Sequence, residues 1–353
     1  MTGTTPTSVT LADVAAAAGV SLATASRVIN GSGERTVGEP YRTKVLAAAE
    51  QLGYLPNAQA QAVARGASSL LGLIVQDISD PYFSAIADGV SRVAEHNGLI
   101  VLLMSTHQDP DRELDYLTTL RAQRVRAIVV VGSRRDDRRR QLRVRREIDA
   151  FVSMGGGVSC VGQDRLGTST VSPRNREGAR ELAAAVAGMG HQRFAILGGP
   201  PKLLTARDRV TGFREGLAEA GITDDAVHVL PGAFTRDGGY EATREILCGG
   251  EAPTCLFAVN DVMAVGAMAA LRDAGIHVPE QLSVAGFDDI ETLRDIAPSL
   301  TTVRLPLREM GQLAAEMALG GGGPRVRRIR GEVILRQSTA PPNLDARIQY
   351  ERT

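Results

Sequence analysis

The sequence predicts two folds in one chain: an all-α head with a helix-turn-helix, followed by a two-lobed α/β domain. Between Val9 and Asn30, two short amphipathic helical patterns flank a glycine. From Leu70 onward, short apolar runs alternate with helical patterns, which is typical of a parallel sheet covered by helices. This alternation occurs twice, which indicates two lobes with a cleft at the carboxyl ends of the strands.

Length and composition are those of a globular protein with two or three domains. The chain has 353 residues, of which 43% are hydrophobic and 23% charged, and its formal net charge is zero. Residues 1–66 carry five cationic and four acidic side chains, which leaves a net charge of +1. Long-range attraction to nucleic acid is therefore expected to be weak, so DNA affinity would depend on placed contacts and dimerisation.

Cysteine usage and the N-terminus predict a cytoplasmic protein. Cys160, Cys248 and Cys255 are an odd number without metal-ligand spacing, and they predict buried thiols in a reducing compartment. The Thr-rich start has no apolar signal core, and no stretch approaches the length of a membrane span. We expect no secretion, no membrane partner, no metal and no cofactor.

The first predicted helix covers 11–18. Its apolar residues recur at i, i+3, i+4 and i+7: Leu11, Val14, Ala15 and Ala18. Thr10 precedes this run and Asp13 follows three residues later, an acidic variant of the capping box. Gly19 then provides the backbone freedom that a sharp turn needs.

The second predicted helix begins after Ser21, whose hydroxyl can accept an unpaired backbone N–H, and it extends to Asn30. One face is apolar and packs inward. The other face is small and polar with one arginine: Ala23, Ser26, Arg27 and Asn30. Such a face fits the major groove of DNA.

A third helix is predicted from about Tyr41 to Leu52, with Gly53 as its stop signal. Four side chains are expected to point inward: Val45, Leu46, Ala49 and Leu52. After Pro56, a run of small residues at 57–65 is too short to be a stable helix alone. We expect it to order only when something packs against it.

From Leu70, the pattern predicts strands and helices in alternation. The first unit has expected strands at 70–75, 99–104 and 127–131 and helices at about 83–96 and 112–123. The same pattern restarts with expected strands near 159–161, 194–197, 256–259 and 282–286. The sequence therefore predicts two such units in tandem.

Two further features have competing interpretations. The arginine-rich run 134–146 would suit nucleic acid, but the charges around Leu142 and Ile148 are more typical of an exposed connecting helix. The glycine clusters at 155–157 and 198–201 are interpreted as turns. The sequence has no P-loop, HExxH or GxSxG motif, so we do not expect an enzyme.

Ten short motifs occur in the order and spacing of one known family. In the N-terminal part they are Thr10-Leu-x-Asp-Val-Ala15, Gly19-Val-Ser21, Ser26-Arg-Val-Ile-Asn30, Leu52-Gly-Tyr-x-Pro-Asn57 and Asp80-Pro-Tyr-Phe83. In the C-terminal part they are Gly190-His191, Ala206-Arg-x-Arg-x-x-Gly-Phe213, Asn260-Asp261, Gly286-Phe-Asp-Asp289 and Pro298-x-Leu-Thr-Thr-Val303. From Val9 to Leu335, the chain resembles the lactose-repressor/galactose-repressor family of bacterial transcription regulators.

The resemblance implies a DNA-binding head (1–56), a hinge helix and linker (57–67), and an effector-binding and dimerisation domain (68–353) like the periplasmic sugar-binding proteins. It implies a homodimer on a near-palindromic operator, and a sugar or sugar phosphate in the cleft that changes DNA affinity. The segment after Pro342 lacks leucine heptads, so we expect a dimer and not a tetramer. A corepressor-activated regulator and a sugar-binding transport protein are the alternatives.

In the head, Arg27 matches the family's recognition-helix arginine and is the expected base reader, because arginine pairs bidentately with guanine. A phosphate contact is the alternative. Leu22 and Ala23 occupy the family's two variable reading positions and suit contact with a thymine methyl. The remaining expected DNA contacts are Thr10, Ser21, Thr24, Ser26, Asn30 and Asn57; Thr10 and Ser21 can alternatively act as helix caps alone.

Val63 stands where family members usually carry a leucine that wedges into a minor-groove base step. Such a wedge offsets the unstacking of bases with a bent duplex that makes more contacts. Valine is shorter and β-branched, so it is expected to insert less deeply. The alternative is packing between two hinge helices.

In the cleft, Arg209, Asn260 and Asp288 match the family's effector-binding residues, and their donors and acceptors suit hydroxyl groups. A structural Arg209–Asp288 ion pair is the alternative, and Asp289 is expected to be structural. Phe234 matches an aromatic residue that packs on the effector in some members, with a core phenylalanine as the alternative. The first lobe is expected to contribute Gln76, Asp77, Tyr82 and Phe83.

The chain departs from the family at Arg174-Asn175, where many relatives have Asp-Asn. Pro173 precedes this pair. A cation near the rim of the cleft would favour an anionic effector, so the departure leaves the identity of the effector open.

Overall fold

The computed structural model describes residues 9–30, 37–55, 68–249 and 253–343. The chain divides into two compact units, Met1–Ser69 and Leu70–Thr353, which are described separately below. Asn57 and Val63 lie outside the described residues, as does the side chain of Asn30. The predictions for these three residues therefore stay predictions.

The N-terminal unit is a three-helix head: α1 (Leu11–Ala18), α2 (Leu22–Asn30) and α3 (Glu39–Gln51). Gly19 follows α1 with φ of 64°, the left-handed conformation that glycine adopts at little cost. The axes of α1 and α2 meet at 107°, as in a helix-turn-helix. The predicted positions of the first two helices are confirmed.

The core of the head is built from small residues. Val14, Ala25 and Val45 are completely buried, and Ala48 and Ala49 of α3 pack beside them. The prediction that Leu46 and Leu52 point inward is wrong, because their exposed fractions are 47% and 37%. Leu46 lies about 100° around the helix from Val45. Leu52 follows the last residue of α3.

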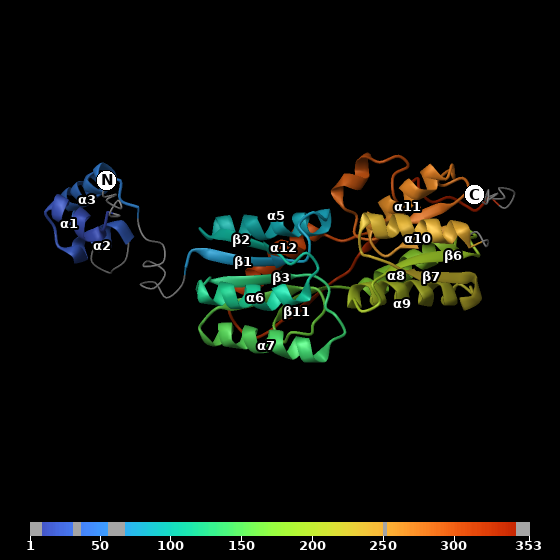
Figure 1. Ribbon diagram of the computed structural model, residues 1–353, viewed down its shortest axis with the longest axis horizontal. Helices are drawn as coiled ribbons and strands as arrows, with labels where there is room; N and C mark the ends of the chain where they lie inside the picture. Colours follow the sequence, from blue (N-terminus) through green and yellow to red (C-terminus); the bar gives the residue numbers. More distant parts are fainter. Residues whose placement is uncertain (1–8, 31–36, 56–67, 250–252, 344–353) are drawn as a thin grey trace, which may run out of the picture. The chain divides into compact units, whose positions relative to one another are not determined.

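The first lobe of the C-terminal unit has a six-stranded parallel sheet in the order β11-β5-β4-β3-β1-β2. Its strands are β1 (Leu70–Val75), β2 (Ile100–Ser105), β3 (Ala127–Val131), β4 (Gly157–Val161), β5 (Ser169–Pro173) and β11 (Val326–Ile329). Figure 1 shows α5 (Pro81–His96) and α12 (Leu307–Leu319) on one face, and α6 (Pro110–Ala122) and α7 (Arg138–Ser153) on the other.

The second lobe has a four-stranded parallel sheet in the order β7-β6-β8-β9. Its strands are β6 (Phe194–Gly199), β7 (Val227–Pro231), β8 (Cys255–Ala258) and β9 (Ser283–Ala285). The helices pack in two pairs: α8 (Asn175–Ala187) with α9 (Leu204–Glu219), and α10 (Arg236–Cys248) with α11 (Asp261–Asp273). A short antiparallel ribbon joins β10 (Thr302–Arg304) to β12 (Glu332–Ile334). Two 3-10 turns complete the lobe: η1 (Asp224–Ala226) and η2 (Glu291–Asp295).

The prediction of two α/β units in tandem is wrong in one respect. The strand expected at 159–161, which opened the second unit, is β4 and pairs with β3 in the first lobe, with Ala127 opposite Gly157. The chain also returns to the first lobe, where α12 packs on α5 and β11 pairs with β5. Apolar periodicity identifies a strand but not its neighbours, which depend on long-range pairing.

Residues 138–146 of the arginine-rich run form the first part of α7, which connects β3 and β4. Val144, Ile148 and Phe151 bury its inner face, so the prediction of a connecting helix is confirmed.

Cys160 and Cys255 are buried, but Cys248 at the end of α10 is exposed, which corrects the expectation of three buried thiols. Within the described ranges, no single helix is long and apolar enough to span a membrane. Only α1 and α2 together have the necessary length and composition, and they are bent by 107° at their junction.

Candidate DNA-reading helix and effector cleft

Thr10 and Asp13 form a reciprocal capping box at the start of α1. The Thr10 hydroxyl accepts the backbone N–H of Asp13 at 3.3 Å, and Asp13 Oδ2 accepts the Thr10 N–H at 2.8 Å. The Thr10 hydroxyl also donates to Asp13 Oδ2 at 2.7 Å. These hydrogen bonds lower the pKa of Asp13 below its usual value. Thr10 therefore has a capping role, and its phosphate contact stays a prediction.

Ser21 caps α2 in a similar way. Its hydroxyl oxygen accepts the Thr24 N–H at 3.2 Å, and the two hydroxyl groups lie 2.9 Å apart. A Ser at this position satisfies one of the free N–H groups at the helix start, with a typical contribution of about 1 kcal/mol. The sequence predicted Ser21 as a cap from its position just before the second helix, and this hydrogen bond confirms the prediction.

The face of α2 that was predicted to read DNA is exposed. Ser21, Leu22, Ala23 and Arg27 are exposed, and Thr24 and Ser26 are half-buried. Ala25, on the opposite face, is completely buried. Within residues 9–30 and 37–55, no carboxylate forms an ion pair with Arg27. The Arg27 side chain is therefore exposed to solvent, one helical turn from Ala23 on the same face of α2.

A cleft lies between the two lobes of the C-terminal unit, at the carboxyl ends of their strands. Its deeper part, the inner chamber, has a volume of about 30 Å³ and is lined by Asp80, Tyr82, Asn175, Arg209 and Asp288 among others. Its wider part, the outer cavity, has a volume of about 230 Å³ and is lined by Asp77, Gln108, Arg135 and Thr235 among others. Both parts share five lining residues: Gln76, Asp80, Phe83, Ser133 and Phe234.

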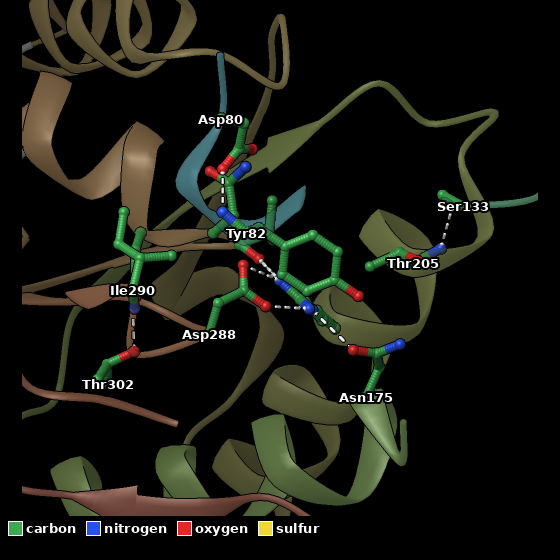
Figure 2. A network of polar contacts seen from close by, with 12 residues as sticks. Asp80, Tyr82, Ser133, Asn175, Thr205, Asp288, Ile290 and Thr302 are labelled. Carbon is green, nitrogen blue, oxygen red and sulfur yellow. Dashed lines mark hydrogen bonds and ion pairs between the residues drawn. The ribbon is translucent and has the colours of Figure 1, made fainter. Parts of the chain in front are cut away.

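Arg209 is the centre of the inner chamber, although it is itself 2% exposed. Its Nη2 donates to Asp288 Oδ1 at 2.6 Å, and its Nη1 donates to Asp288 Oδ2 at 3.2 Å. Nε donates to Asn175 Oδ1 at 2.9 Å, and Nη1 also donates to the carbonyl of Val259 at 2.7 Å. The guanidinium carbon lies 3.8 Å from the centre of the Phe287 ring. Figure 2 shows Asn175 and Asp288 converging in this network, with the ring of Tyr82 beside them.

Asp288 is held in an unusual conformation. Its φ is 125°, a region that residues other than glycine rarely adopt. Burial raises the pKa of its carboxyl to about 7, while the charge and hydrogen bonds of Arg209 act in the opposite direction. Strained backbone of this kind is concentrated at functional sites. Asp288 forms the ion pair that was the alternative interpretation, and its contact with an effector stays a prediction that the strained backbone favours.

Asp80 approaches the inner chamber from the first lobe. Its Oδ1 accepts the Tyr82 N–H at 2.9 Å and caps α5. Burial raises the pKa of Asp80 to about 7, and the negative charges of Asp288 and Asp77 add to this increase. Two carboxyl groups, one from each lobe, therefore line one small chamber. Burial also raises the pKa of the neighbouring Tyr82 phenol above its usual range.

Two residues next to this network have structural roles. Burial acts to raise the pKa of Asp289, but hydrogen bonds from Arg336 and Arg304 outweigh it and the pKa is lowered. Arg304 Nε and Arg336 Nη1 both lie 2.7 Å from its carboxylate oxygens. Asn260 caps α11, because its Oδ1 accepts the Met263 N–H at 2.9 Å. Within the described residues its buried Nδ2 has no partner.

A set of contacts beside the cleft joins the two lobes, and we name it the interlobe latch. It joins the segment 133–136 and Gln163 of the first lobe to 202–207 of the second. The Thr205 N–H donates to the Ser133 hydroxyl at 3.0 Å, and Gln163 Nε2 donates to the Thr205 hydroxyl at 2.8 Å (Figure 2 shows Ser133 and Thr205). The Leu204 N–H donates to the Arg134 carbonyl at 2.9 Å. Arg135 and Leu203 form an antiparallel bridge.

The structure brings most of the predicted cleft residues together. Seven line the inner chamber, the outer cavity or both: Gln76, Asp77, Tyr82, Phe83, Arg209, Phe234 and Asp288. Asn260 lines neither, so its ligand contact stays a prediction. Arg174 also lines neither; it pairs with Glu177 at 2.8 Å on the surface. The expectation that Arg174 adds a cation to the rim of the cleft is therefore wrong.

Sequence reasoning missed several polar residues of the site, of which four have a clear role. Asn175 holds Arg209, Asp80 lines both parts of the cleft, and Ser133 and Thr205 form the latch. Asp80 and Asn175 were visible within motifs that were quoted for other reasons. Ser133 and Thr205 follow apolar strand patterns by a few residues, and that position at the carboxyl end of a parallel strand was the available signal.

The head and the cleft together define a class of protein: a DNA-binding regulator with a sensor domain like the periplasmic binding proteins. The family model "Bacterial regulatory proteins, lacI family" matches residues 10–57, and the model "Periplasmic binding protein-like domain" matches residues 183–339. The chain belongs to the lacI family of bacterial regulatory proteins. The resemblance, the fold class and the absence of an enzymatic function are thereby confirmed, since this is a family of DNA-binding regulators.

Individual relatives cover nearly the whole chain. The HTH-type transcriptional regulator GalR of Escherichia coli is 34% identical, over 96% of this chain and 97% of its own length. GalS of Salmonella typhimurium is 36% identical, over 89% and 90%. The transcriptional repressor PurR of Haemophilus influenzae is 33% identical, over 88% and 90%.

Solved structures show the same architecture. The Lac repressor dimer bound to operator and the anti-inducer ONPF matches with a TM-score of 0.80 and 27% identity, over 95% of this chain and all of the other. The complex of the transcriptional regulator CelR with cellobiose matches with a TM-score of 0.67 and 27% identity, over 94% and 99%.

Proposed function

We propose that this protein is a homodimeric transcriptional repressor whose affinity for operator DNA is set by a small, hydroxyl-rich effector in the cleft. The observation that carries this proposal is the Arg209–Asp288–Asn175 network. It lies in a cleft between two lobes of a chain that also carries an exposed recognition helix. The proposed domains are a head at 1–56, a hinge and linker at 57–67, and an effector and dimerisation domain at 68–353.

The hydrogen-bonding capacity of the inner chamber favours hydroxyl groups. A guanidinium has five N–H donors, and four hydrogen bonds of Arg209 leave one N–H on Nη2. Each Asp288 oxygen accepts one of these bonds and retains a lone pair, and Asp80 adds a carboxyl group from the first lobe. A hydroxyl both donates and accepts, so a polyol satisfies both kinds of group. Phe234 provides an aromatic surface in the same cleft.

The relatives support this ligand class and the assembly. The CelR structure contains cellobiose, and a lacI-family regulator of Enterococcus faecium contains ribose, with a TM-score of 0.69 to this chain. The Lac repressor structure is a dimer on operator DNA. By analogy we assign an operator, a second copy of this chain and a sugar or sugar derivative as partners, in the cytoplasm.

The proposed mechanism couples the cleft to the head through the spacing of the lobes. The latch holds the lobes together around an inner chamber of about 30 Å³, so a sugar enters only when the lobes separate. An effector changes DNA affinity only by as much as it prefers one spacing over the other. A ligand that favours the arrangement unable to bind DNA is an inducer. A ligand that favours the arrangement able to bind DNA is a corepressor, and a corepressor-activated regulator is the second candidate function.

The test has two stages. Thermal-shift screening with neutral sugars and sugar phosphates identifies a ligand, and Arg209→Met should abolish its shift while an Arg27→Ala variant keeps it. Titration of DNA upstream of the neighbouring genes, with and without that ligand, then gives the sign of the coupling. Failure of the full-length protein to bind any such DNA at low salt would overturn the regulator proposal. Sugar binding without DNA binding would favour a transport protein.

A further inference from the structure

The outer face of α7 is a basic surface that neither the head nor the cleft uses. This helix of 16 residues has six arginines and two acidic residues, although the whole chain has a net charge of zero. Its inner face is buried through Val144, Ile148 and Phe151. The remaining charge is therefore concentrated on the side that faces solvent.

Some of these charges are already paired. Arg140 pairs with Asp111 at 2.8 Å, and Glu147 pairs with Arg121 of α6. Five exposed arginines of α7 form no ion pair within residues 68–249 and 253–343, and three of them are Arg139, Arg143 and Arg146. These three occur at i, i+4 and i+7 and form one row along the helix, which we name the α7 arginine row.

We propose that the α7 arginine row binds the phosphate backbone of duplex DNA, independently of the head. The row extends over about 10 Å, because a helix rises about 1.5 Å per residue. Each strand of duplex DNA carries one phosphate per 3.4 Å or so of helix axis, so a stretch of duplex as long as the row carries about three phosphates on each strand. Each guanidinium can fork onto one of them, since its N–H groups match phosphate oxygens.

The row fits DNA better than it fits an acidic protein segment. Protein interfaces depend on a buried apolar anchor surrounded by polar groups. The row itself has no apolar member, and Leu142 in the neighbouring row is 47% exposed between the exposed Arg138 and Arg145. Evenly spaced cations without an anchor match a regularly spaced polyanion. The surface reads no sequence, because phosphate contacts position a protein and carry no base information.

The test compares a variant with the parent protein. The measured quantity is the salt dependence of binding to a DNA duplex of scrambled sequence. The triple variant Arg139→Ala, Arg143→Ala, Arg146→Ala in the full chain is titrated between about 50 and 200 mM salt. The plot of log K against log salt has a negative slope. Each lost phosphate contact should make that slope shallower by about 0.9, so the loss of all three contacts should make it shallower by about 2.7 per protomer. The corresponding Arg→Lys triple variant should keep the slope, because release of counterions depends on charge.

The matched control removes the same charge elsewhere. Arg214→Ala, Arg244→Ala, Arg272→Ala changes three exposed arginines on α9, α10 and α11 of the second lobe. Equal slopes for the two triple variants would overturn the proposal. A second arm measures binding to poly-L-glutamate: if the α7 variant loses that binding but keeps its DNA slope, the row binds acidic protein and the proposal is wrong. Urea unfolding of both variants verifies that they are folded.

Discussion

The recognition helix and the effector cleft differ in how far along the chain their contacts reach. The caps of α1 and α2 join residues three positions apart, at Thr10–Asp13 and Ser21–Thr24. Arg209 contacts groups that lie 34, 50 and 79 residues away. The first site is exposed and local, while the second is buried and depends on the fold of both lobes. Substitutions of exposed, uncapping side chains on the recognition helix, such as Arg27, should therefore change DNA binding alone, and substitutions in the Arg209 network should change folding and ligand binding together.

The largest expected effect is that of Arg209→Ala on stability. It leaves the Asp288 carboxyl and Asn175 buried without their partner, and loss of one member of a buried pair typically costs about 3–5 kcal/mol. Arg214→Ala on the same helix removes an exposed ion pair with Asp224 and should cost less than about 1 kcal/mol. Urea unfolding measures both, and a similar cost for the two variants would contradict the distinction between buried and exposed sites.

The next effect is the loss of sequence discrimination in Arg27→Ala. If Arg27 reads a base, its removal should reduce the ratio of operator affinity to scrambled-DNA affinity roughly 5- to 150-fold. This corresponds to a loss of about 1–3 kcal/mol of discrimination. The free energy of unfolding should not change, because the side chain is exposed. Arg42→Ala on α3 is the control and should leave the ratio unchanged. A uniform loss of affinity for both duplexes would instead make Arg27 a phosphate contact.

Asp80→Asn should stabilise the C-terminal unit more at high pH than at low pH. The pKa of Asp80 is raised to about 7, so the native state binds its proton more tightly than the unfolded state, whose pKa is about 3.9. The carboxyl therefore favours folding at low pH, and this contribution is lost as the pH rises to about 7. Asparagine keeps the Oδ1 that caps α5 but has no proton to lose.

We expect the Tm difference between Asp80→Asn and the parent to grow from pH 5 to pH 8, by about 2 °C or more. Differential scanning calorimetry measures it. Asp109→Asn is the matched control, since Asp109 caps α6 through the Asp111 N–H at 2.9 Å and is 47% exposed. A pH-independent difference for Asp80→Asn would show that this carboxyl is ionised throughout.

Thr205→Val should loosen the interlobe latch. It removes the hydroxyl that accepts from Gln163 but keeps the shape of the side chain and the Thr205 N–H bond to Ser133. The loss of one hydrogen bond typically costs about 0.5–1.5 kcal/mol. Hydrogen exchange of the Leu204 amide should speed up by a matching factor of about 2–10. Thr243→Val, at a buried threonine of α10 in the second lobe, should leave that amide unchanged.

The smallest expected effect concerns Val63, outside the described residues. If this residue wedges into a base step, Val63→Leu should tighten operator binding by less than about tenfold, because one added methylene contributes about 0.8 kcal/mol on burial. Operator titration measures it, with scrambled DNA as the control. Unchanged or weaker operator binding would argue for packing between hinge helices.

The amino-acid sequence determined the features that depend on near neighbours. Capping pairs, the turn at Gly19 and the amphipathic pattern defined α1 and α2, since these signals lie within a few residues of the structure that they specify. Strand and helix positions of the first unit followed from apolar periodicity. Motif resemblance added Arg209 and Asp288 as site residues and so predicted which side chains converge.

Only the tertiary structure decided which of these elements become neighbours. It placed β4 in the first lobe, paired Asn175 with Arg209, and turned Arg174 toward Glu177 on the surface. It also exposed Leu46 and Cys248, which hydrophobicity alone would have buried. The physical reason is that strand pairing and side-chain burial are set by contacts between residues far apart in the chain, and a local pattern carries no record of those partners.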